Sequence, residues 1–219
     1  MSEKKLTSIV KDSYGNEWSI TASFAYISLV EQTPLFKNFN TKEYPDVLGN
    51  VAGQLQLIEF TDLILNNFTF EQEGEVEIPE FLGGGTMGIH NEVEHAICKQ
   101  GLIAAASLAE TVCFIIVVSN GVTLPEHHSF KKLIKVAQQS KLIDEIDADL
   151  LNQLRELRNS LHLHIDSFTT DFYHIEQYET AKSCLYWMLI KLLGIDERVM
   201  SIHFPYLPRR DKEELEFEV

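Results

Sequence analysis

Basic residues are scarce in this chain of 219 residues. Its 18 lysines and arginines are outnumbered by 33 aspartates and glutamates, so the formal charge at pH 7 is −15. A protein that coats nucleic acid without regard to sequence needs many cations to displace the counterions of the phosphates. That class of protein is excluded and we expect no DNA partner, although a small basic pocket on an acidic body remains compatible with the charge.

Cysteine is also scarce, and Cys98, Cys113 and Cys184 lie far apart in the sequence. Three cysteines are too few for a disulfide framework, and an odd number favours a reducing compartment. His90 and His95 precede Cys98 but lack a second pair of ligands at zinc spacing, so we expect neither a metal nor a cofactor. The first six residues lack the apolar core of a signal peptide. These absences predict a cytoplasmic protein.

The longest apolar run covers residues 102–118 and contains a single charged residue, Glu110. The run is short for a membrane span, and it lacks the aromatic and basic anchors that flank such spans. A helix that is apolar on nearly every side is equally typical of the centre of a soluble bundle. We therefore expect a core helix and no membrane partner.

Alternation of apolar and polar residues indicates a β-containing domain in residues 1–82. From Trp18 to Tyr26 every second residue is apolar, which is the period of a strand. Turn-forming residues at 12–16 precede this run, so residues 6–10 are expected to pair with it in a hairpin. The region shows no catalytic motif. A second strand pair is expected between residues 68–71 and 75–79, and residues 51–67 fit either a strand or a helix.

From residue 90 onward the apolar residues recur with the period of a helix. The first helix is expected to begin after the N-cap Asn91 and to end at Gly121, and Asp147 is expected to cap the third. Two further helices are expected over residues 129–140 and 177–193. Four helices with short connections are typical of an antiparallel bundle.

The predicted fold class is therefore α+β, with a four- to five-helix bundle after the β-containing domain. The glycine-rich run between the two is predicted to be a linker, because no Gly-Lys-Ser/Thr follows it as in a phosphate-binding loop. The predicted parts are a β-rich domain at residues 1–82, the linker at 83–89, the bundle at 90–196 and an acidic tail at 197–219.

The third helix of the bundle carries the most concentrated chemistry in the chain. Arg155, Arg158 and His162 are spaced by three and four residues, so they share one stripe of the helix. Two guanidiniums and an imidazole beside a leucine seam either pair with carboxylates across the bundle or face a groove that accepts an anion. Surface ion pairs and a packed histidine are the plainer interpretation, because structural ion-pair networks are common.

The segment around this helix resembles the HEPN superfamily, the higher eukaryotes and prokaryotes nucleotide-binding domains. The signature of that family is an arginine, usually followed by a polar residue, and a histidine after four to six intervening residues. Arg158-Asn159 with His164 leaves five residues between, and Arg155 with His162 leaves six. Arg158 with His162 leaves only three, so either histidine remains a candidate. The resemblance covers residues 90–196.

Many members of that family are metal-independent endoribonucleases whose homodimers share one cleft. The resemblance implies that Arg158 holds the scissile phosphate and stabilises its transition-state charge. His164 or His162 would act as general acid and base in the attack of the ribose 2′-hydroxyl. Asn159 would orient the phosphate or the imidazole. RNA, a second copy of the chain and a cognate inhibitor protein are the partners that this activity implies.

The charged residues near the motif are compatible with either an anion-binding site or a structural ion pair. A local anion-binding face is expected from a group of cations, although acidic residues of the same stretch dilute it. Glu110 is isolated in an apolar helix and needs a partner, which Arg155 or Arg158 would supply. If Glu110 neutralises Arg158, the motif is a structural ion pair; if it only orients Arg158, the motif is a site. The expected anion-binding cations are Lys131, Lys132, Lys135 and Arg155.

The sequence thus predicts a metal-independent endoribonuclease of toxin or defence type, which cleaves RNA in a dimer cleft. Its prokaryotic, phage-defence context follows from the resemblance alone. The alternative is a catalytically inactive HEPN-like module that mediates dimerisation or binds another protein. An enzyme and a binding module are both compatible with the residues of the third helix.

Overall fold

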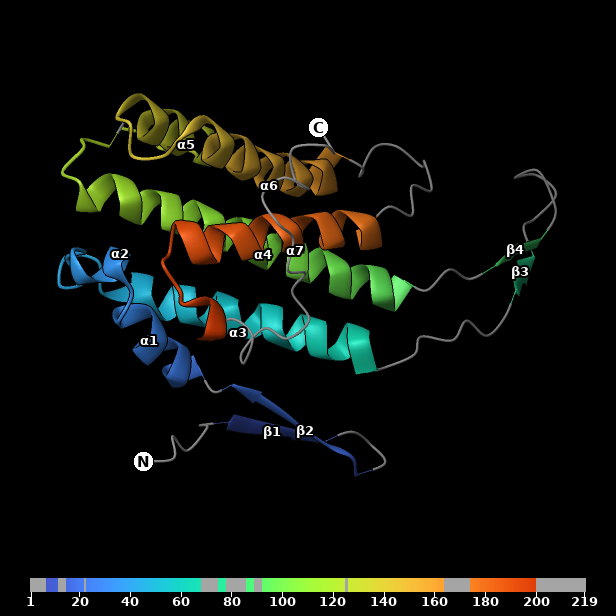
Figure 1. Cartoon of the computed structure of the whole chain (residues 1–219). Coiled ribbons are helices and arrows are strands. Elements are labelled where there is room, and N and C mark those ends of the chain that lie inside the picture. Colours follow the sequence, from blue (N-terminus) through green and yellow to red (C-terminus); the bar gives the residue numbers. More distant parts are fainter. Residues whose placement is uncertain are drawn as a thin grey trace.

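Helices form most of the structure in the computed structural model (Figure 1). They are α1 (Ser23–Glu31), α2 (Pro34–Lys37), α3 (Pro45–Asn67), α4 (Glu92–Ser119), α5 (Phe130–Gln139), α6 (Glu145–Leu163) and α7 (His174–Lys191). The strands are β1 (Thr7–Lys11), β2 (Glu17–Thr21), β3 (Glu75–Glu77) and β4 (Thr86–Gly88). The structure describes residues 7–11, 15–21, 23–67, 75–77, 86–88, 92–124, 126–163 and 174–199.

The α+β prediction is wrong, because the N-terminal region is mainly helical rather than β-rich. The alternation that begins at Trp18 leaves the strand at Thr21, and α1 begins two residues later. Tyr26 and Val30 are then fully buried one helical turn apart. The spacing of the apolar residues in this run is therefore compatible with a helix as well as with a strand. Packing against the other helices decides between the two.

The segment at residues 51–67, which fitted a strand or a helix, is part of the long helix α3. Four of its six buried residues recur at spacings of four, three and four residues, the stripe of a helix that faces a core. These side chains are Val51, Leu55, Ile58 and Asp62.

The N-terminal hairpin is confirmed, and it lies against α3. β1 and β2 pair antiparallel with Val10 opposite Trp18. The Glu59 carboxylate of α3 accepts hydrogen bonds from the backbone N–H and the hydroxyl of Thr21, at 2.9 and 3.0 Å. It also accepts one from the Tyr26 hydroxyl at 2.7 Å. One side chain therefore joins the hairpin, α1 and α3.

The second strand pair differs from the prediction. β3 pairs antiparallel with β4, with Val76 opposite Met87, so residues 86–88 of the predicted linker form a strand. The predicted strand at residues 68–71 lies outside the described residues, as do the linker glycines at 83–85 and residues 200–219 of the predicted tail.

The four helices predicted after residue 90 are confirmed as α4 to α7, which belong to a helical bundle. Gly121 and Gly194 have φ angles of +68° and +78°, so each provides the left-handed residue that follows the end of a helix. The cap of α6 lies three residues before the predicted one. The Asp144 carboxylate accepts from the Asp147 backbone N–H at 2.9 Å, and the Asp147 carboxylate accepts from the Asp144 backbone N–H at 3.1 Å.

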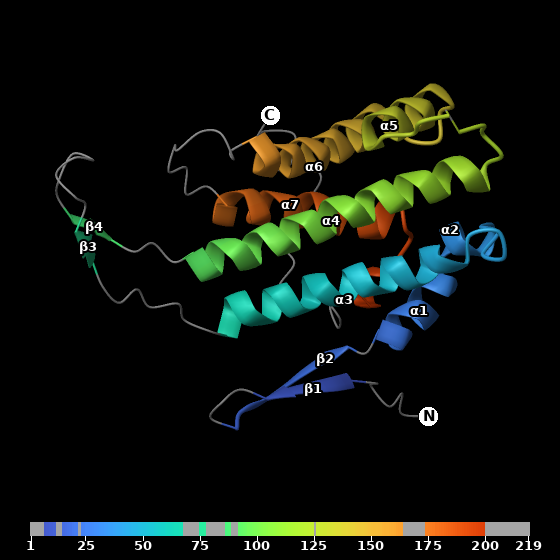
Figure 2. The same ribbon diagram turned by 180° about the vertical axis from the view of Figure 1, so that it is seen from behind.

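α4 is the central helix, in contact with α3, α5, α6 and α7. Figures 1 and 2 show α3 and α4 side by side, with α7 over α4 in the first view and α4 in front in the second. Buried side chains from α1, α3 and the later helices belong to one cluster. By length and composition, Glu94–Ser119 could cross a membrane, but 67% of its apolar window is buried inside the structure. Cytoplasmic localisation stays a prediction.

Gly101 lies where α4 packs tightly between α7 and α3. A Cβ atom at this position would lie 2.4 Å from Cε2 of Tyr178 and 2.8 Å from Cγ2 of Thr61. We predict that Gly101→Ala lowers the free energy of unfolding by about 1–3 kcal/mol, because the helices must separate to admit the methyl group.

Urea denaturation measures this change, and Gly49→Ala in α3 is the matched control. No atom lies within 4 Å of a Cβ at position 49, so alanine there should be neutral or stabilise by roughly 0.5–1 kcal/mol through its helix propensity. Equal effects of the two substitutions would contradict the tight packing at Gly101.

Candidate functional site

Arg158, the predicted phosphate-binding residue, is paired with a carboxylate inside the bundle. It projects from α6 so that its Nη1 lies 2.6 Å from Oε2 of Glu110 in α4. Its guanidinium also lies over the ring of Phe130 in α5, 5.8 Å from the ring centroid. The Arg158 and Glu110 side chains are 26% and 32% exposed, so the pair lies at the edge of the core. One arginine thereby joins three helices.

The Arg155 guanidinium, one turn earlier in α6, also interacts with neighbouring side chains. Its Nε donates to Oδ1 of Asn152 at 3.1 Å, and its Nη2 lies 2.7 Å from Oε1 of Glu156. Asn159 is exposed on the same helix. Position 162 belongs to α6, but the side chain of His162 and the whole of His164 lie outside the described residues. The choice between the two histidines therefore stays a prediction.

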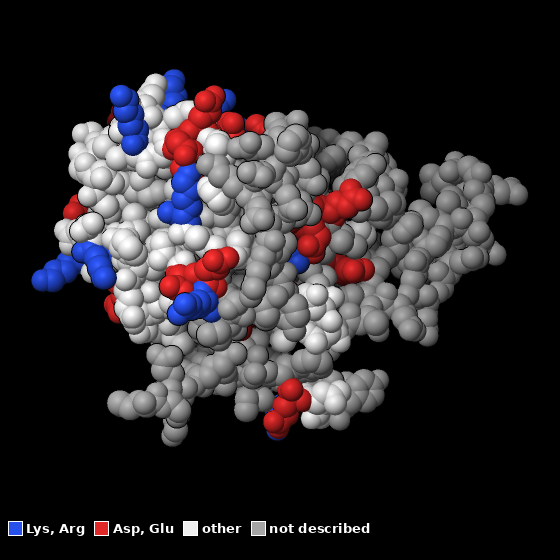
Figure 3. Space-filling model, in the orientation of Figure 1, with Lys and Arg blue, Asp and Glu red and all other residues white. Residues whose placement is uncertain are grey.

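The three predicted anion-binding lysines are exposed along α5. Lys132 is directed to the preceding loop, where its Nζ donates to the backbone carbonyl of His127 at 2.8 Å. Figure 3 shows lysines and arginines interspersed with carboxylates over the described part of this face. Lys131 and Lys135 are exposed, and neither makes an ion pair among the described residues.

A cleft of about 380 Å³ lies between α6 and α7, on a different face of α6 from the Arg158 pair. Among the described residues that line it, neither arginine occurs and Glu156 is the one charged side chain. A phosphate there would lie beside the Glu156 carboxylate, which already pairs with Arg155. The lining residues are Gln153, Glu156, Leu157, Ser160, Gln177, Thr180, Ser183 and Cys184.

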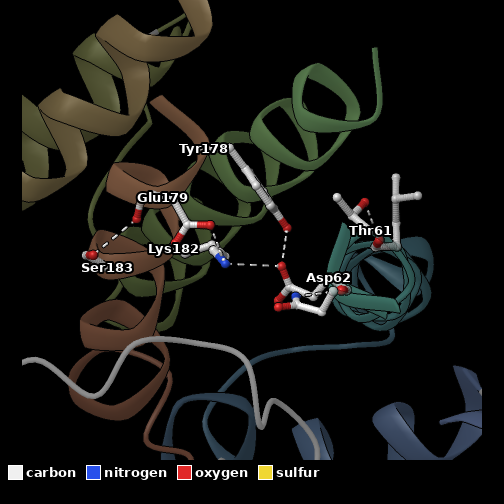
Figure 4. A network of polar contacts seen from close by, with 8 residues as sticks. Thr61, Asp62, Tyr178, Glu179, Lys182 and Ser183 are labelled. Carbon is white, nitrogen blue, oxygen red and sulfur yellow. Dashed lines mark hydrogen bonds and ion pairs between the residues drawn. The ribbon is translucent and has the colours of Figure 1, made fainter. Parts of the chain in front are cut away.

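A buried polar cluster between α3 and α7 was not anticipated from the sequence (Figure 4). Asp62 is 2% exposed. Its Oδ1 accepts from the Tyr178 hydroxyl at 2.9 Å and lies 3.7 Å from Nζ of Lys182. Lys182, also buried, lies 2.7 Å from Oε1 of Glu179. Oδ2 of Asp62 has no hydrogen-bond partner among the described residues.

Burial decides the electrostatics of this cluster. Loss of solvation raises the pKa of Asp62 to about 6, although Lys182 and the hydrogen bond from Tyr178 act in the opposite direction. Burial and the neighbouring Asp62 raise the pKa of Tyr178 above its ordinary value. The Tyr178–Asp62 hydrogen bond joins α3 to α7 across 116 residues of sequence. A pattern of neighbouring residues therefore could not predict the cluster.

A second ion-pair cluster joins the start of α6 to the end of α7. Lys191 Nζ lies 2.8 Å from Oδ2 of Asp144 and 2.6 Å from Oδ1 of Asp147. The indole N–H of Trp187 donates to Oδ1 of Asp147 at 3.2 Å. The bond from Lys191 lowers the pKa of Asp144 to about 2. These contacts stabilise the end of the bundle.

Nucleophilic and metal chemistry find no support in the described residues. All three cysteines are buried thiols, and burial raises the pKa of Cys98 to about 11 and those of Cys113 and Cys184 to about 12. No group of three or more histidine, cysteine, aspartate or glutamate side chains that could hold a metal ion occurs in the described parts of the chain.

Comparison of the chain with protein-family models, with the curated proteins and with solved structures finds no match. The similarity of α6 to the HEPN signature thus rests on its own residues and stays a prediction.

The buried carboxylate gives a prediction for the dependence of stability on pH. Because the pKa of Asp62 in the folded protein lies above its ordinary value of 3.8, the folded state binds the proton more tightly than the unfolded state does. Protonation therefore stabilises the fold. We predict that the free energy of unfolding of the wild type, relative to that of Asp62→Asn, increases as the pH falls from 7 to 4.5.

Urea denaturation of the two proteins at matched pH values measures the difference. Asparagine keeps the shape of the protonated acid and does not titrate, so subtraction removes the contributions of all other groups. A difference that is constant, or that grows as the pH rises, would show that Asp62 does not carry a raised pKa.

Proposed function

We propose that this chain is a catalytically inactive helical module that binds another protein. The observation that carries the catalytic inactivity is the 2.6 Å contact between Arg158 and Glu110. An arginine that holds a scissile phosphate must offer its charge and its donors to phosphate oxygens. Here a carboxylate of the same chain already accepts from the guanidinium, and a phosphate would have to displace it against charge repulsion.

The surroundings of Arg158 support the same proposal. Arg155 is bound by Asn152 and Glu156, so it cannot serve as a second free phosphate ligand without giving up these contacts. The chain as a whole carries a formal charge of −15, which repels the RNA backbone at long range. We therefore expect the chain to attract RNA weakly at long range and to bind its phosphates weakly at Arg158.

The second candidate is the metal-independent endoribonuclease of toxin or defence type. The specific observation in its favour is that the Arg158 side chain is 26% exposed at the edge of the bundle. Glu110 would then orient the guanidinium, and His164 or His162 would transfer the proton. Such an enzyme would act as a homodimer, and a cognate inhibitor protein would restrain it.

RNA cleavage in EDTA separates the two candidates. We predict that the purified wild type leaves single-stranded and structured RNAs intact, as do Arg158→Ala, His162→Ala and His164→Ala. Arg158→Ala should instead lower the free energy of unfolding by about 1 kcal/mol, the effect of a partly exposed ion pair.

Glu110→Gln is the matched control, because it keeps the shape of the partner and removes its charge. It should reproduce the loss of stability without creating a nuclease. Cleavage by the wild type that leaves a 2′,3′-cyclic phosphate, and that disappears in Arg158→Ala and in one histidine variant, would instead establish the ribonuclease.

A further inference from the structure

Three hydroxyl groups among the described lining of the cleft between α6 and α7 already use their hydrogens. Each donates to a backbone carbonyl of its own helix, at 2.7 Å for Ser160, 3.0 Å for Thr180 and 3.1 Å for Ser183. Figure 4 shows this contact for Ser183, which is directed to the backbone of Glu179. A hydroxyl oxygen keeps two lone pairs when its hydrogen is engaged. These groups can therefore accept hydrogen bonds from a ligand, but they cannot donate one without giving up a backbone contact.

Carboxylates add further acceptors and negative charge. Glu156 lines the cleft from α6, and its side chain is 70% exposed. Its Oε1 is paired with Arg155, whereas its Oε2 makes no hydrogen bond or ion pair among the described residues. Glu176 is exposed on α7 one turn before Thr180, and therefore on the same side of that helix. No lysine or arginine occurs among the described residues that line the cleft.

The rest of the described lining is apolar or neutral. Leu157 contributes an apolar side chain, and the Cys184 thiol donates across the two helices to Oε1 of Gln153 at 3.3 Å. The amides of Gln153 and Gln177 carry no charge and contain both a donor and an acceptor. A volume of about 380 Å³ is in the range of sites for small ligands. The cleft thus has room for a short apolar stem that ends in a polar group.

We propose that this cleft binds a primary ammonium group at the end of a short alkyl chain. An ammonium group has three N–H donors, no acceptor and a positive charge, so it complements hydroxyl and carboxylate oxygens whose lone pairs are available. The alkyl chain would pack against Leu157 and Cys184. A guanidinium fits less well, because its planar fork favours both oxygens of one carboxylate and Oε1 of Glu156 is already paired with Arg155. An anion would lie among acceptors and beside a carboxylate.

A lysine side chain of a partner protein is the source of the ammonium group on this account. The formal charge of −15 attracts basic partners at long range, and the cleft then gives one lysine of the partner a specific place. This step names the chemistry of the partner and rests on the proposed function. The preference of the cleft for ammonium rests on its lining alone. A free polyamine carries the same group, so the experiment has to separate the two sources.

NMR titration of the full chain with butylammonium, 1-butanol and butyrate tests the inference, because the three probes share a four-carbon frame and differ in the polar group. We expect butylammonium to cause saturable changes in the chemical shifts of the backbone amides around the cleft. We expect 1-butanol to bind at least about 5-fold more weakly, since it has one donor and no charge. Butyrate should cause no saturable change.

Variants of the lining locate the site. Glu156→Gln removes the charge, and Thr180→Val keeps the shape of the side chain but removes the acceptor oxygen. We expect each to weaken butylammonium binding at least about 3-fold. Glu145→Gln makes the same change of charge at the start of α6 and should leave the affinity unchanged. All three positions are exposed, so circular dichroism should show the same helical fold in each variant.

Absence of saturable butylammonium binding overturns the inference, as does equal binding of 1-butanol or binding that withstands both Glu156→Gln and Thr180→Val. A capped Gly-Lys-Gly peptide that binds in the cleft at least as tightly as butylammonium supports a lysine of a protein partner. Spermidine that binds more tightly than this peptide, and loses that advantage in Thr180→Val, would overturn the lysine and assign the cleft to a free polyamine. The proposed function fails separately: RNA cleavage by a wild type that binds butylammonium would overturn the inactive module and retain the ammonium site.

Discussion

Burial of α4 is the constraint on which the rest of the structure depends. Nineteen of the twenty residues from position 100 to 119 are uncharged, so water is a poor environment for most of this helix. α3, α5, α6 and α7 remove it from solvent, and at Gly101 the contact is so close that only glycine fits. The one charge in this stretch, Glu110, must be compensated at the edge of the core. Arg158 compensates it and thereby fixes α6 against α4.

This arrangement explains how a short motif can resemble a catalytic site and still have a structural role. The arginine of the motif lies on the side of α6 that faces α4 and α5, whereas the cleft between α6 and α7 lies on another side of that helix. A phosphate bound in the cleft would not reach Arg158, and a phosphate at Arg158 would compete with Glu110. The geometry therefore argues against phosphate binding at Arg158.

The bundle helices could be predicted because their signals are local. Apolar periodicity indicates the helices after residue 90, and the glycines at 121 and 194 mark the ends of α4 and α7. The need of Glu110 for a partner could be inferred as well, because an isolated carboxylate in an apolar helix requires a cation and few cations were available to pair with it. In the N-terminal region the alternation from Trp18 to Tyr26 was misleading, because a short apolar run fits two periods and tertiary packing selects one. Asp62 was missed, although it follows the buried apolar residues Leu55 and Ile58 on the core-facing stripe of α3.

The most direct test of the account is the state of the Arg158 guanidinium in solution. Side-chain NMR of protein labelled at arginine, with Arg158→Lys to assign the signal, would follow it while a single-stranded RNA oligonucleotide is added. If Glu110 holds the guanidinium, the chemical shifts of Arg158 in the wild type will not change as RNA is added. The substitution Glu110→Gln will change these chemical shifts. A saturable shift of the wild-type signal with RNA would show that Arg158 binds phosphate, and it would contradict the assignment of this residue to a structural ion pair.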